Sequence, residues 1–444
     1  MSQLGASDTR EMTPENPPSA GIGRYRWLVC ALLFFATTIN YIDRQILSLL
    51  KPILDHELHW TNEQFGDVNS AFQAAYALSL LGFGALIDRF GARIGYALSI
   101  AAWSLAAIGH SFVGSVGGFL RARVALGLGE GGNFPSAIKV VALWFPKKER
   151  ALATAIFNSG ANVGAIVAPA IIPWLAFTFG WRSAFVAAGI AGLVWLGFWL
   201  PFYEAPERIK HLRADELAHI RSDAGAVEST VKVSWLSLLK YRQTWAFIVA
   251  KFLTDPVWWF FLIWLPDYFQ KTRNLDIKHS WVHLVSIYAI VTVLSIFGGW
   301  FTGYLTRTGL SASRARKTAM FIFACLVLPI FFATKVGNVS AVLLIGLAGA
   351  AHQAWSANLF TTASDTFPKR AVASVVGIGG MAGSFGGILF PKYSGKLLDR
   401  FQASGNITAG YAILFALCGS AYLIAFVLNH LLAPKFEQVE LSEG

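Results

Sequence analysis

Apolar runs of about 20 residues recur along the whole chain, and they restrict what it can fold into. A run of that length forms a helix that crosses roughly 30 Å of hydrocarbon. The composition agrees, because 55% of the 444 residues are hydrophobic and only 14% are charged, whereas soluble domains carry about 25% charged residues. We therefore predict an all-α membrane protein.

Twelve such runs can be delimited, and we expect each to be one transmembrane helix. They lie at 27–50, 66–86, 95–113, 117–144, 151–176, 183–203, 244–268, 281–305, 317–334, 338–364, 371–397 and 408–433. At about 20 residues each they occupy more than half of the chain, so no large soluble domain fits in the remainder.

The longest polar interruption follows the sixth run and separates two sets of six. The expected segments are a disordered cytoplasmic tail (1–23), an N-terminal six-helix bundle (24–203), a cytoplasmic linker (204–242), a C-terminal six-helix bundle (243–434) and a second cytoplasmic tail (435–444). Within the linker, PERIKHLRADELAHI can alternatively form a short amphipathic helix on the membrane surface.

The distribution of Lys and Arg predicts the orientation of the chain. With the N-terminus in the cytoplasm, 22 of these residues fall in cytoplasmic segments and 9 in external ones, so the positive-inside rule places both termini in the cytoplasm. The net charge of +11 then reflects topology and contact with anionic lipids, not nucleic-acid binding. Cys30, Cys325 and Cys418 lie in apolar runs and are interpreted as core residues without disulfides.

The two halves resemble each other in sequence. The stretches 145–169 and 367–391 align without gaps at an offset of 222, and both open with Phe-Pro-Lys. Each is a basic loop that leads into a Gly-rich helix. Duplicated halves are typical of transporters that rock one bundle against the other around a site at mid-membrane.

Ionisable side chains inside the apolar runs mark candidate sites, because each costs several kcal/mol unless it is paired or hydrated. The first run contains Asn40, Tyr41, Asp43 and Arg44. Neighbouring residues on a helix point about 100° apart. We therefore expect Arg44 and Tyr41 to face a cavity and Asp43 to face a neighbouring helix.

The fourth run contains Arg123 and Glu130 among glycines. Seven residues are two helical turns, about 10.5 Å, and we expect the long Arg123 side chain to bring the two charges into electrostatic contact. The glycines around Glu130 let another helix or a substrate approach closely.

Two runs of the second half carry further candidates. In the seventh, Lys251 and Asp255 lie at i,i+4, where they act either as a self-neutralised structural pair or in binding and gating. The tenth supplies donors and an aromatic wall within two turns, and weaker candidates of the same kind lie in runs two and five. These residues are His352, Gln353, Trp355, Asn358, Tyr76 and Asn162. A core histidine with satisfied hydrogen bonds is the structural alternative for His352.

Together, Arg side chains, amide and hydroxyl donors and aromatic rings suit an organic anion. Arg recognises carboxylates in bidentate fashion, and neutral donors suit a polyhydroxylated body. A sugar acid fits both parts of this description.

The loop between runs two and three reads GALIDRFGAR. This sequence matches the pattern G-x-L-x-D-R-x-G-x-R, so the chain resembles the major facilitator superfamily. Gly84 and Gly91 permit close approach and a tight turn, while Asp88, Arg89 and Arg93 can form charge-assisted contacts that control conformation.

The chain further resembles the anion:cation symporter family, and within it the bacterial hexuronate transporters, through Asp43–Arg44, Arg123 and Glu130, and the stretches DPVWWFFLIWLP and AHQAWSANLFTTASDTFP. The resemblance implies proton-coupled uptake of a sugar acid such as glucuronate or galacturonate. It implies that Asp43 and Glu130 carry protons, that Arg44 holds the substrate carboxylate and that Tyr41 and Tyr76 line the site. Galactonate carriers have Gln and Asn where this chain has Ala161 and Gly380, which disfavours galactonate itself.

Two other classes of protein fit the sequence less well. The chain lacks H-E-x-x-H, G-x-S-x-G and P-loop sequences, which disfavours an enzyme, and no pore filter indicates a channel. An organic-anion exchanger without proton coupling remains the alternative. We expect a monomeric carrier in the bacterial inner membrane, with protons and a sugar acid anion as partners and with no cofactor, metal or nucleic acid.

Overall fold

In the computed structural model, residues 23–210, 212–222, 235–275 and 277–439 are described. Throughout these ranges the chain forms helices and no strand, as predicted. The helices of the first half are α1 (Tyr25–Leu58), α2 (Asn62–His110), α3 (Val116–Glu130), α4 (Asn133–Trp144), α5 (Lys147–Phe179) and α6 (Trp181–Phe202). Between the halves lie η1 (Pro206–Arg208), α7 (Ala214–Ile220) and α8 (Trp235–Leu238). The second half contains α9 (Arg242–Arg273), α10 (Ile277–Arg307), α11 (Ala312–Val327), η2 (Leu328–Phe332), α12 (Asn338–Thr366), α13 (Lys369–Ala403) and α14 (Ile407–Leu432).

The predicted spans correspond to these helices. Within the described residues, ten helical segments are long and apolar enough to cross a membrane, and they coincide with ten of the predicted runs. The other two runs are helical as well. The run at 66–86 is the first part of α2, and the run at 117–144 is divided between α3 and α4.

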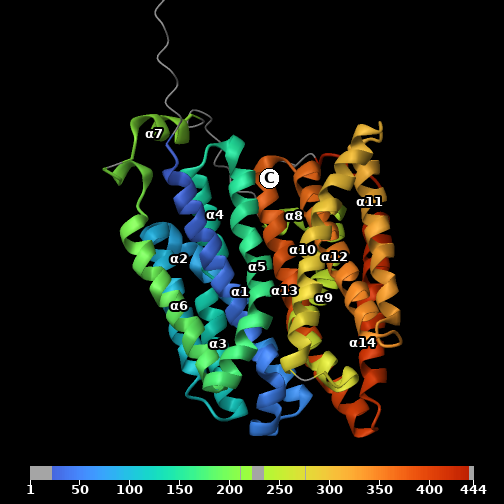
Figure 1. The fold of residues 1–444 in the computed structure, drawn as a ribbon. Coiled ribbons are helices and arrows are strands. Elements are labelled where there is room, and N and C mark those ends of the chain that lie inside the picture. Colours follow the sequence, from blue (N-terminus) through green and yellow to red (C-terminus); the bar gives the residue numbers. More distant parts are fainter. Residues whose placement is uncertain (1–22, 211, 223–234, 276, 440–444) are drawn as a thin grey trace, which may run out of the picture.

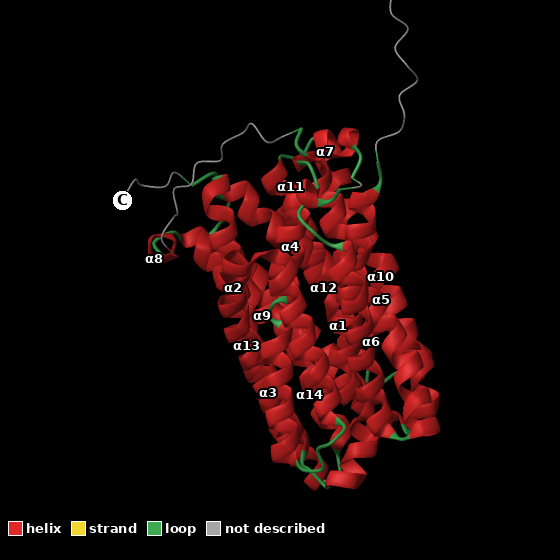
Figure 2. Ribbon diagram, turned by 90° about the vertical axis from the view of Figure 1, so that its left-hand side faces the viewer, coloured by secondary structure: helices red, strands yellow, loops and turns green. Residues whose placement is uncertain are grey.

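The helices form two bundles that lie side by side. Figure 1 shows α1–α6 on one side and α9–α14 on the other. Contacts between the bundles join α2 to α13, α5 to α10 and α1 to α9. The start of α1, the linker helix α7 and the last described residues lie at one end of the molecule (Figures 1 and 2). We call this end the termini side and the opposite end the far side.

Part of the linker is helical and docks on the first bundle. The carboxylate of Glu216 in α7 accepts hydrogen bonds from the backbone nitrogens of Tyr25 (3.1 Å) and Arg26 (2.9 Å). A carboxylate at this position satisfies free N–H groups at the start of α1 and complements the helix dipole. The remaining linker residues 223–234 lie outside the described residues, as do 1–22 and 440–444 of the predicted tails.

The fourth span is interrupted at Gly131 and Gly132, between α3 and α4. Serine hydroxyls of α2 bond to the last turn of α3: Ser99 donates to the carbonyl of Gly129 (2.6 Å), and Ser79 donates to the carbonyl of Leu128. A Cβ at Gly131 would lie 2.5 Å from the Ser79 side chain. The glycines therefore let α2 approach the break, and Glu130 is the last residue before it.

Gly91 separates the second and third spans inside α2. Its backbone angles, φ 81° and ψ 162°, lie in a region that is essentially restricted to glycine. This glycine belongs to the loop pattern at 84–93, and the turn expected from the sequence is confirmed.

We expect Gly91→Ala to lower stability by roughly 1–3 kcal/mol, since a Cβ strains this backbone conformation. Thermal unfolding of the purified protein would show a lower melting temperature. Gly109→Ala is the matched control, because Gly109 lies in the same helix with open space around the added carbon. Equal melting temperatures for the two variants would contradict the prediction.

Candidate functional site

An ion pair between α1 and α3 lies at the centre of the candidate site. Nε of Arg44 donates to Oε2 of Glu130 at 2.6 Å. Both side chains are buried, with 6% and 0% of their surfaces exposed. Separating two such charges in a dry interior costs several kcal/mol. The pair will therefore break only when another anion or a proton replaces one of its charges.

Aromatic rings surround the guanidinium of Arg44. Its carbon lies 5.2 Å from the ring centre of Tyr41, 4.5 Å from that of Tyr76, 5.5 Å from that of Phe72 and 5.4 Å from that of Trp259. All four distances are within the range of cation–π attraction. Trp259 belongs to α9, so it contacts the ion pair from the second bundle.

Next to this pair lie polar groups that lack partners. Asp43 is 2% exposed, and neither of its carboxylate oxygens has a hydrogen bond within the described part of the chain. The same holds for the side-chain amide of Asn40 and for Oε1 of Glu130. Buried polar atoms are normally hydrogen-bonded. This cluster is thus suited to take up water, a proton or a polar ligand.

Arg123 interacts electrostatically with Glu130, as expected, but its hydrogen bond goes to a different partner. Its terminal nitrogen Nη2 donates to the backbone carbonyl of Arg44 at 3.3 Å, and its guanidinium lies over Phe72 at 5.4 Å. The ion pair of Glu130 is made by Arg44 instead. The two-turn spacing placed Arg123 and Glu130 near the same neighbouring helix. It did not indicate that α1 brings its own arginine closer to Glu130.

The candidates from the tenth span are bound within the second bundle. Nδ1 of His352 is 2.6 Å from the hydroxyl of Tyr422, and its ring stacks on Trp258. Trp355 is fully buried and packs against Tyr422. Asn358 donates to the carbonyl of Ala354. These contacts correspond to the structural alternative for His352 and do not connect the group to Arg44. Gln353 and Asn162 are half-buried.

Lys251 and Asp255 form the expected ion pair, with 2.6 Å between Nζ and Oδ2. Lys251 also lies 4.3 Å from the ring centre of Phe360 in α12. A Cβ on Gly383 of α13 would come within 2.2 Å of the Asp255 carboxylate. The Lys251–Asp255 pair therefore lies where α9, α12 and α13 meet. Movement of these helices relative to one another would change the surroundings of the pair.

The loop pattern at 84–93 contributes one clear contact. Arg93 forms an ion pair with Glu204 at 2.5 Å, and its carbonyl accepts from the indole of Trp199 at 3.0 Å. Trp199 lies in the last turn of α6 and Glu204 lies just after this helix, so both contacts stay within the first half. Arg89 is exposed and lies over Phe90. The side chain of Asp88 and the surroundings of Gly84 lie outside the described residues.

A second buried charge cluster joins the two bundles on the far side, and sequence reasoning missed it. Nζ of Lys51 in α1 lies 2.8 Å from Oδ1 of Asp267 in α9 and 2.7 Å from Oδ2 of Asp55. Lys271 and the hydroxyl of Tyr411 also contact Asp267. The signal available was Asp267 directly after the apolar stretch WFFLIWLP.

Nearby, a helix start strengthens this junction. The carboxylate of Asp399 in α13 accepts from the backbone nitrogens of Asn62 (2.9 Å) and Glu63 (2.8 Å) at the start of α2. Together with Lys51–Asp267, this cap holds the two bundles together on the far side.

We expect Asp267→Asn to open the far side. Removing this carboxylate leaves the buried Lys51 charge with a weaker set of partners, and breaking a buried pair costs about 3–5 kcal/mol. The closed state loses that stabilisation. The measurement is the rate at which a membrane-impermeant maleimide labels a cysteine introduced by Ser70→Cys. Ser70 lies at the interface, where its hydroxyl donates to the carbonyl of Ile388 in the other bundle.

The matched control is Lys392→Gln. Lys392 and Asp67 also link the bundles on the far side, but their side chains are 48% and 37% exposed, and exposed pairs contribute about 0–1 kcal/mol. Labelling of Asp267→Asn no faster than that of Lys392→Gln would refute a closing role for Asp267.

Two helical bundles that meet around a buried ion pair are consistent with a membrane transporter, and the matching family and relatives are transporters, not enzymes. The chain belongs to the Major Facilitator Superfamily, whose sequence model matches residues 33–391. The predicted superfamily is thus confirmed.

Several of the similar proteins are named as sugar acid transporters. The hexuronate transporter of Escherichia coli (strain K12) is 30% identical over 401 residues, which cover 88% of this chain and 90% of the relative. The galacturonate transporter of Dickeya chrysanthemi is 31% identical over 256 residues, 57% of this chain and 74% of the relative.

Solved structures share the fold. A bacterial homologue of the human lysosomal transporter Spinster, in an inward-facing and occupied conformation, superposes with a TM-score of 0.73 at 16% identity, covering 94% of this chain and 98% of that one. A D-xylose–proton symporter also gives 0.73, at 14% identity, with 94% and 100% coverage.

Proposed function

We propose that the chain is a proton-coupled symporter that imports a sugar acid anion, with a hexuronate such as glucuronate or galacturonate as its substrate. The observation that carries the proposal is the buried Arg44–Glu130 ion pair beside the unpartnered carboxylate of Asp43. A pair of this kind can exchange its internal anion for an external one only if a proton arrives with it.

The substrate class is supported by the relatives and by the chemistry of the site. The relatives named above carry hexuronate and galacturonate, which combine a carboxylate with a polyhydroxylated body. Arg44 provides a planar fork for the carboxylate. Asn40 and the hydroxyls of Tyr41 and Tyr76 provide neutral partners for sugar hydroxyls, and the rings of Tyr76 and Trp259 provide flat apolar faces.

Proton coupling follows from competition for Arg44. With Glu130 ionised, its carboxylate occupies Nε of Arg44 at 2.6 Å. When a proton binds to Glu130, the guanidinium loses its anionic partner and binds the substrate carboxylate instead. After the bundles rock and the site opens to the other side, Glu130 releases its proton, re-forms the pair and displaces the substrate.

This exchange conserves charge at the site. One proton and one monoanion enter together, so the buried region stays neutral while it crosses, which avoids the cost of moving a net charge through the low-dielectric centre. A second proton on Asp43 would carry one positive charge inward per cycle. Uptake under an imposed membrane potential distinguishes the one-proton cycle from the two-proton cycle. Only the two-proton cycle is accelerated by a negative interior.

Other proposals follow from charge and packing. We place the termini side in the cytoplasm of a bacterial cell, as the excess of Lys and Arg indicates, and we propose that the carrier works as a monomer in the inner membrane. The pair Lys251–Asp255 and the contact Arg93–Glu204 would then act as conformational contacts, not as substrate ligands.

The experiment is uptake of radiolabelled glucuronate and galacturonate into liposomes that contain the purified protein. We expect accumulation above the external concentration only when an inward proton gradient is imposed. A protonophore should reduce the internal concentration to the external one. Absence of gradient-driven accumulation of any sugar acid would refute symport.

The alternative, an anion exchanger, makes a different prediction in the same liposomes. An exchanger takes up labelled glucuronate only when the liposomes are preloaded with unlabelled anion, and its rate is insensitive to the proton gradient. The buried Glu130 in contact with Arg44 favours symport, because an exchanger has no use for an internal carboxylate that competes with its substrate.

A further inference from the structure

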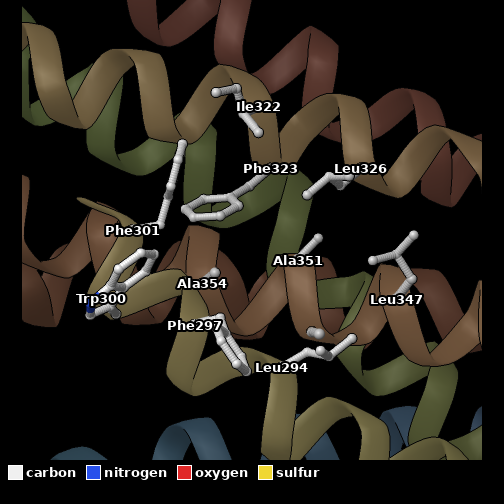
Figure 3. Close-up of a pocket in the computed structure, with 12 residues that line it drawn as sticks. Leu294, Phe297, Trp300, Phe301, Ile322, Phe323, Leu326, Leu347, Ala351 and Ala354 are labelled. Carbon is white, nitrogen blue, oxygen red and sulfur yellow. The ribbon is translucent and has the colours of Figure 1, made fainter. Parts of the chain in front are cut away.

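Two pockets lie one after the other along the outer surface of the second bundle, between α10, α11 and α12, and we call the two together the groove. Its first part is an apolar cavity of about 330 Å³. Figure 3 shows the side chains that line it, including Phe297, Phe301 and Phe323, around one shared space. Phe297 and Trp300 each expose 59% of their surface, so the cavity opens outward along a membrane-spanning helix.

The second part of the groove, about 280 Å³, lies next along the same three helices toward the termini side. Here α10 contributes Thr302 and Thr306, α12 contributes Asn358 and Thr361, and α11 contributes Arg316. The lining thus changes from aromatic and aliphatic to polar and cationic within about two helical turns. Neither part touches the Arg44–Glu130 site.

Arg316 has capacity for a further anion. Its Nε is paired with Asp365 at 2.5 Å, while its two terminal nitrogens carry no hydrogen bond within the described residues. Arg307 and Arg314 are exposed at the same end of α10 and α11. Three arginines against one aspartate leave a net positive charge at the polar end.

We propose that this groove binds a glycerophospholipid with an anionic headgroup, drawn from the leaflet on the termini side. An acyl chain lies in the apolar part against Phe297 and Phe323, and the phosphate lies at Arg316. The apolar part of the groove matches the acyl chain of such a lipid, and the cationic end matches its anionic headgroup. A free phosphate ion matches only the cationic end.

The position of the groove gives the bound lipid a structural consequence. The same helix α10 that forms its wall packs against α5 of the first bundle. A lipid chain that fills the space behind α10 supports this helix from the outside, where the apolar cavity otherwise leaves side chains without packing partners.

The test uses phosphatidylglycerol with a photoactivatable diazirine in its acyl chain, with the full-length protein in lipid nanodiscs. After illumination, labelled peptides are mapped by mass spectrometry. We expect labelling of the α10 and α11 peptides that contain Phe297 and Phe323 to exceed that of α6. The comparison is fair because Phe198 of α6 is 52% exposed, close to the 59% of Phe297.

Three variants locate the headgroup. Arg316→Gln should reduce labelling about fivefold, the effect of one basic residue near the membrane surface, and Ala357→Trp should reduce it by filling the polar end. Lys240→Gln is the control, because it removes a positive charge at the same end of the bundle, outside the groove. It should leave labelling unchanged.

Competition distinguishes the sources of the anion. Unlabelled phosphatidylglycerol should displace the probe, whereas inorganic phosphate and phosphatidylethanolamine should not. Equal labelling of α6 and α10, or equal labelling of wild type and Arg316→Gln, would overturn the proposal. Competition by phosphatidylethanolamine as strong as that by phosphatidylglycerol would refute the anionic headgroup.

Discussion

Replacing Glu130 with glutamine is expected to abolish proton-driven accumulation of substrate while exchange continues. Glutamine has the shape of a protonated glutamate and cannot release a proton, so Arg44 stays available to the substrate in every conformation. With one proton per monoanion, an inward gradient of one pH unit supports about tenfold accumulation. In Glu130→Gln the internal concentration should rise only to the external one.

The measurement is net uptake and counterflow in the same liposome preparation. Counterflow, the exchange of labelled external for unlabelled internal glucuronate, reports that the variant is folded and still binds. Glu57→Gln is a control, since Glu57 is a partly exposed carboxylate paired with Arg182 on the surface. A Glu130→Gln protein that still concentrates glucuronate would show that the coupling proton binds elsewhere, with Asp43 as the next candidate.

Replacing Arg44 is expected to remove substrate binding itself. Arg44→Lys keeps a positive charge for Glu130 but loses the planar fork and its contact with the four rings. A hydrogen bond to a charged group contributes about 1.5–3 kcal/mol, so we expect affinity for glucuronate to fall roughly 10- to 100-fold. For Arg44→Ala we expect no binding between about pH 5 and pH 8, because protonating Glu130 no longer frees a cation.

Equilibrium binding of radiolabelled glucuronate to purified protein tests this expectation. Arg44→Lys is the informative variant, since Arg44→Ala leaves Glu130 buried without a partner and loses stability. Arg182→Lys is the control, because Arg182 makes a surface pair and its side chain is 52% exposed. Wild-type affinity in Arg44→Lys would exclude Arg44 as the carboxylate ligand.

The two variants also separate coupling from binding. If the same ion pair serves both coupling and binding, Glu130→Gln binds substrate without concentrating it, and Arg44→Lys binds substrate roughly 10- to 100-fold more weakly. In a carrier whose coupling proton binds at a remote site, Glu130→Gln would still concentrate substrate in response to the proton gradient. The comparison is therefore a test of the proposed competition at Arg44, independent of which sugar acid is carried.

Much of the fold was predictable from the sequence, because hydrocarbon imposes strict demands on length and polarity. The apolar runs correspond to helices, and the turn at Gly91 was expected from its loop pattern. The break after Glu130 was not expected. The glycines there predicted close packing, whereas the interruption depends on serines of α2 that bond to α3 carbonyls.

The candidate site was predictable in its residues and less so in its pairings. Asp43, Arg44 and Glu130 stood out as costly charges in apolar runs, and the structure brings Arg44 and Glu130 into direct contact. Helical periodicity indicates which face a side chain occupies. It does not indicate which residue of a distant helix faces it, and so the direct ion pair between Arg44 and Glu130 was not predicted.

The same limit applies to the second half. His352 and Trp355 lie close to each other in the tenth run, and their polar and aromatic character grouped them with Arg44 as site candidates. In the structure their partners are Tyr422 and Trp258. Trp258 and Trp259 are adjacent in the chain and point about 100° apart. One stacks on His352, and the other reaches Arg44.

The amino-acid sequence by itself determined that this chain spans a membrane as helices and that it belongs to a family of carriers, since these properties follow from local composition and pattern. It also shows that one stretch of each half is similar to the other. The tertiary structure alone decided that Arg44 pairs with Glu130, that Trp259 contacts the pair from the other bundle and that Lys51 and Asp267 close the far side. These contacts join residues 86, 215 and 216 positions apart, and only the packing of whole helices determines which of them meet.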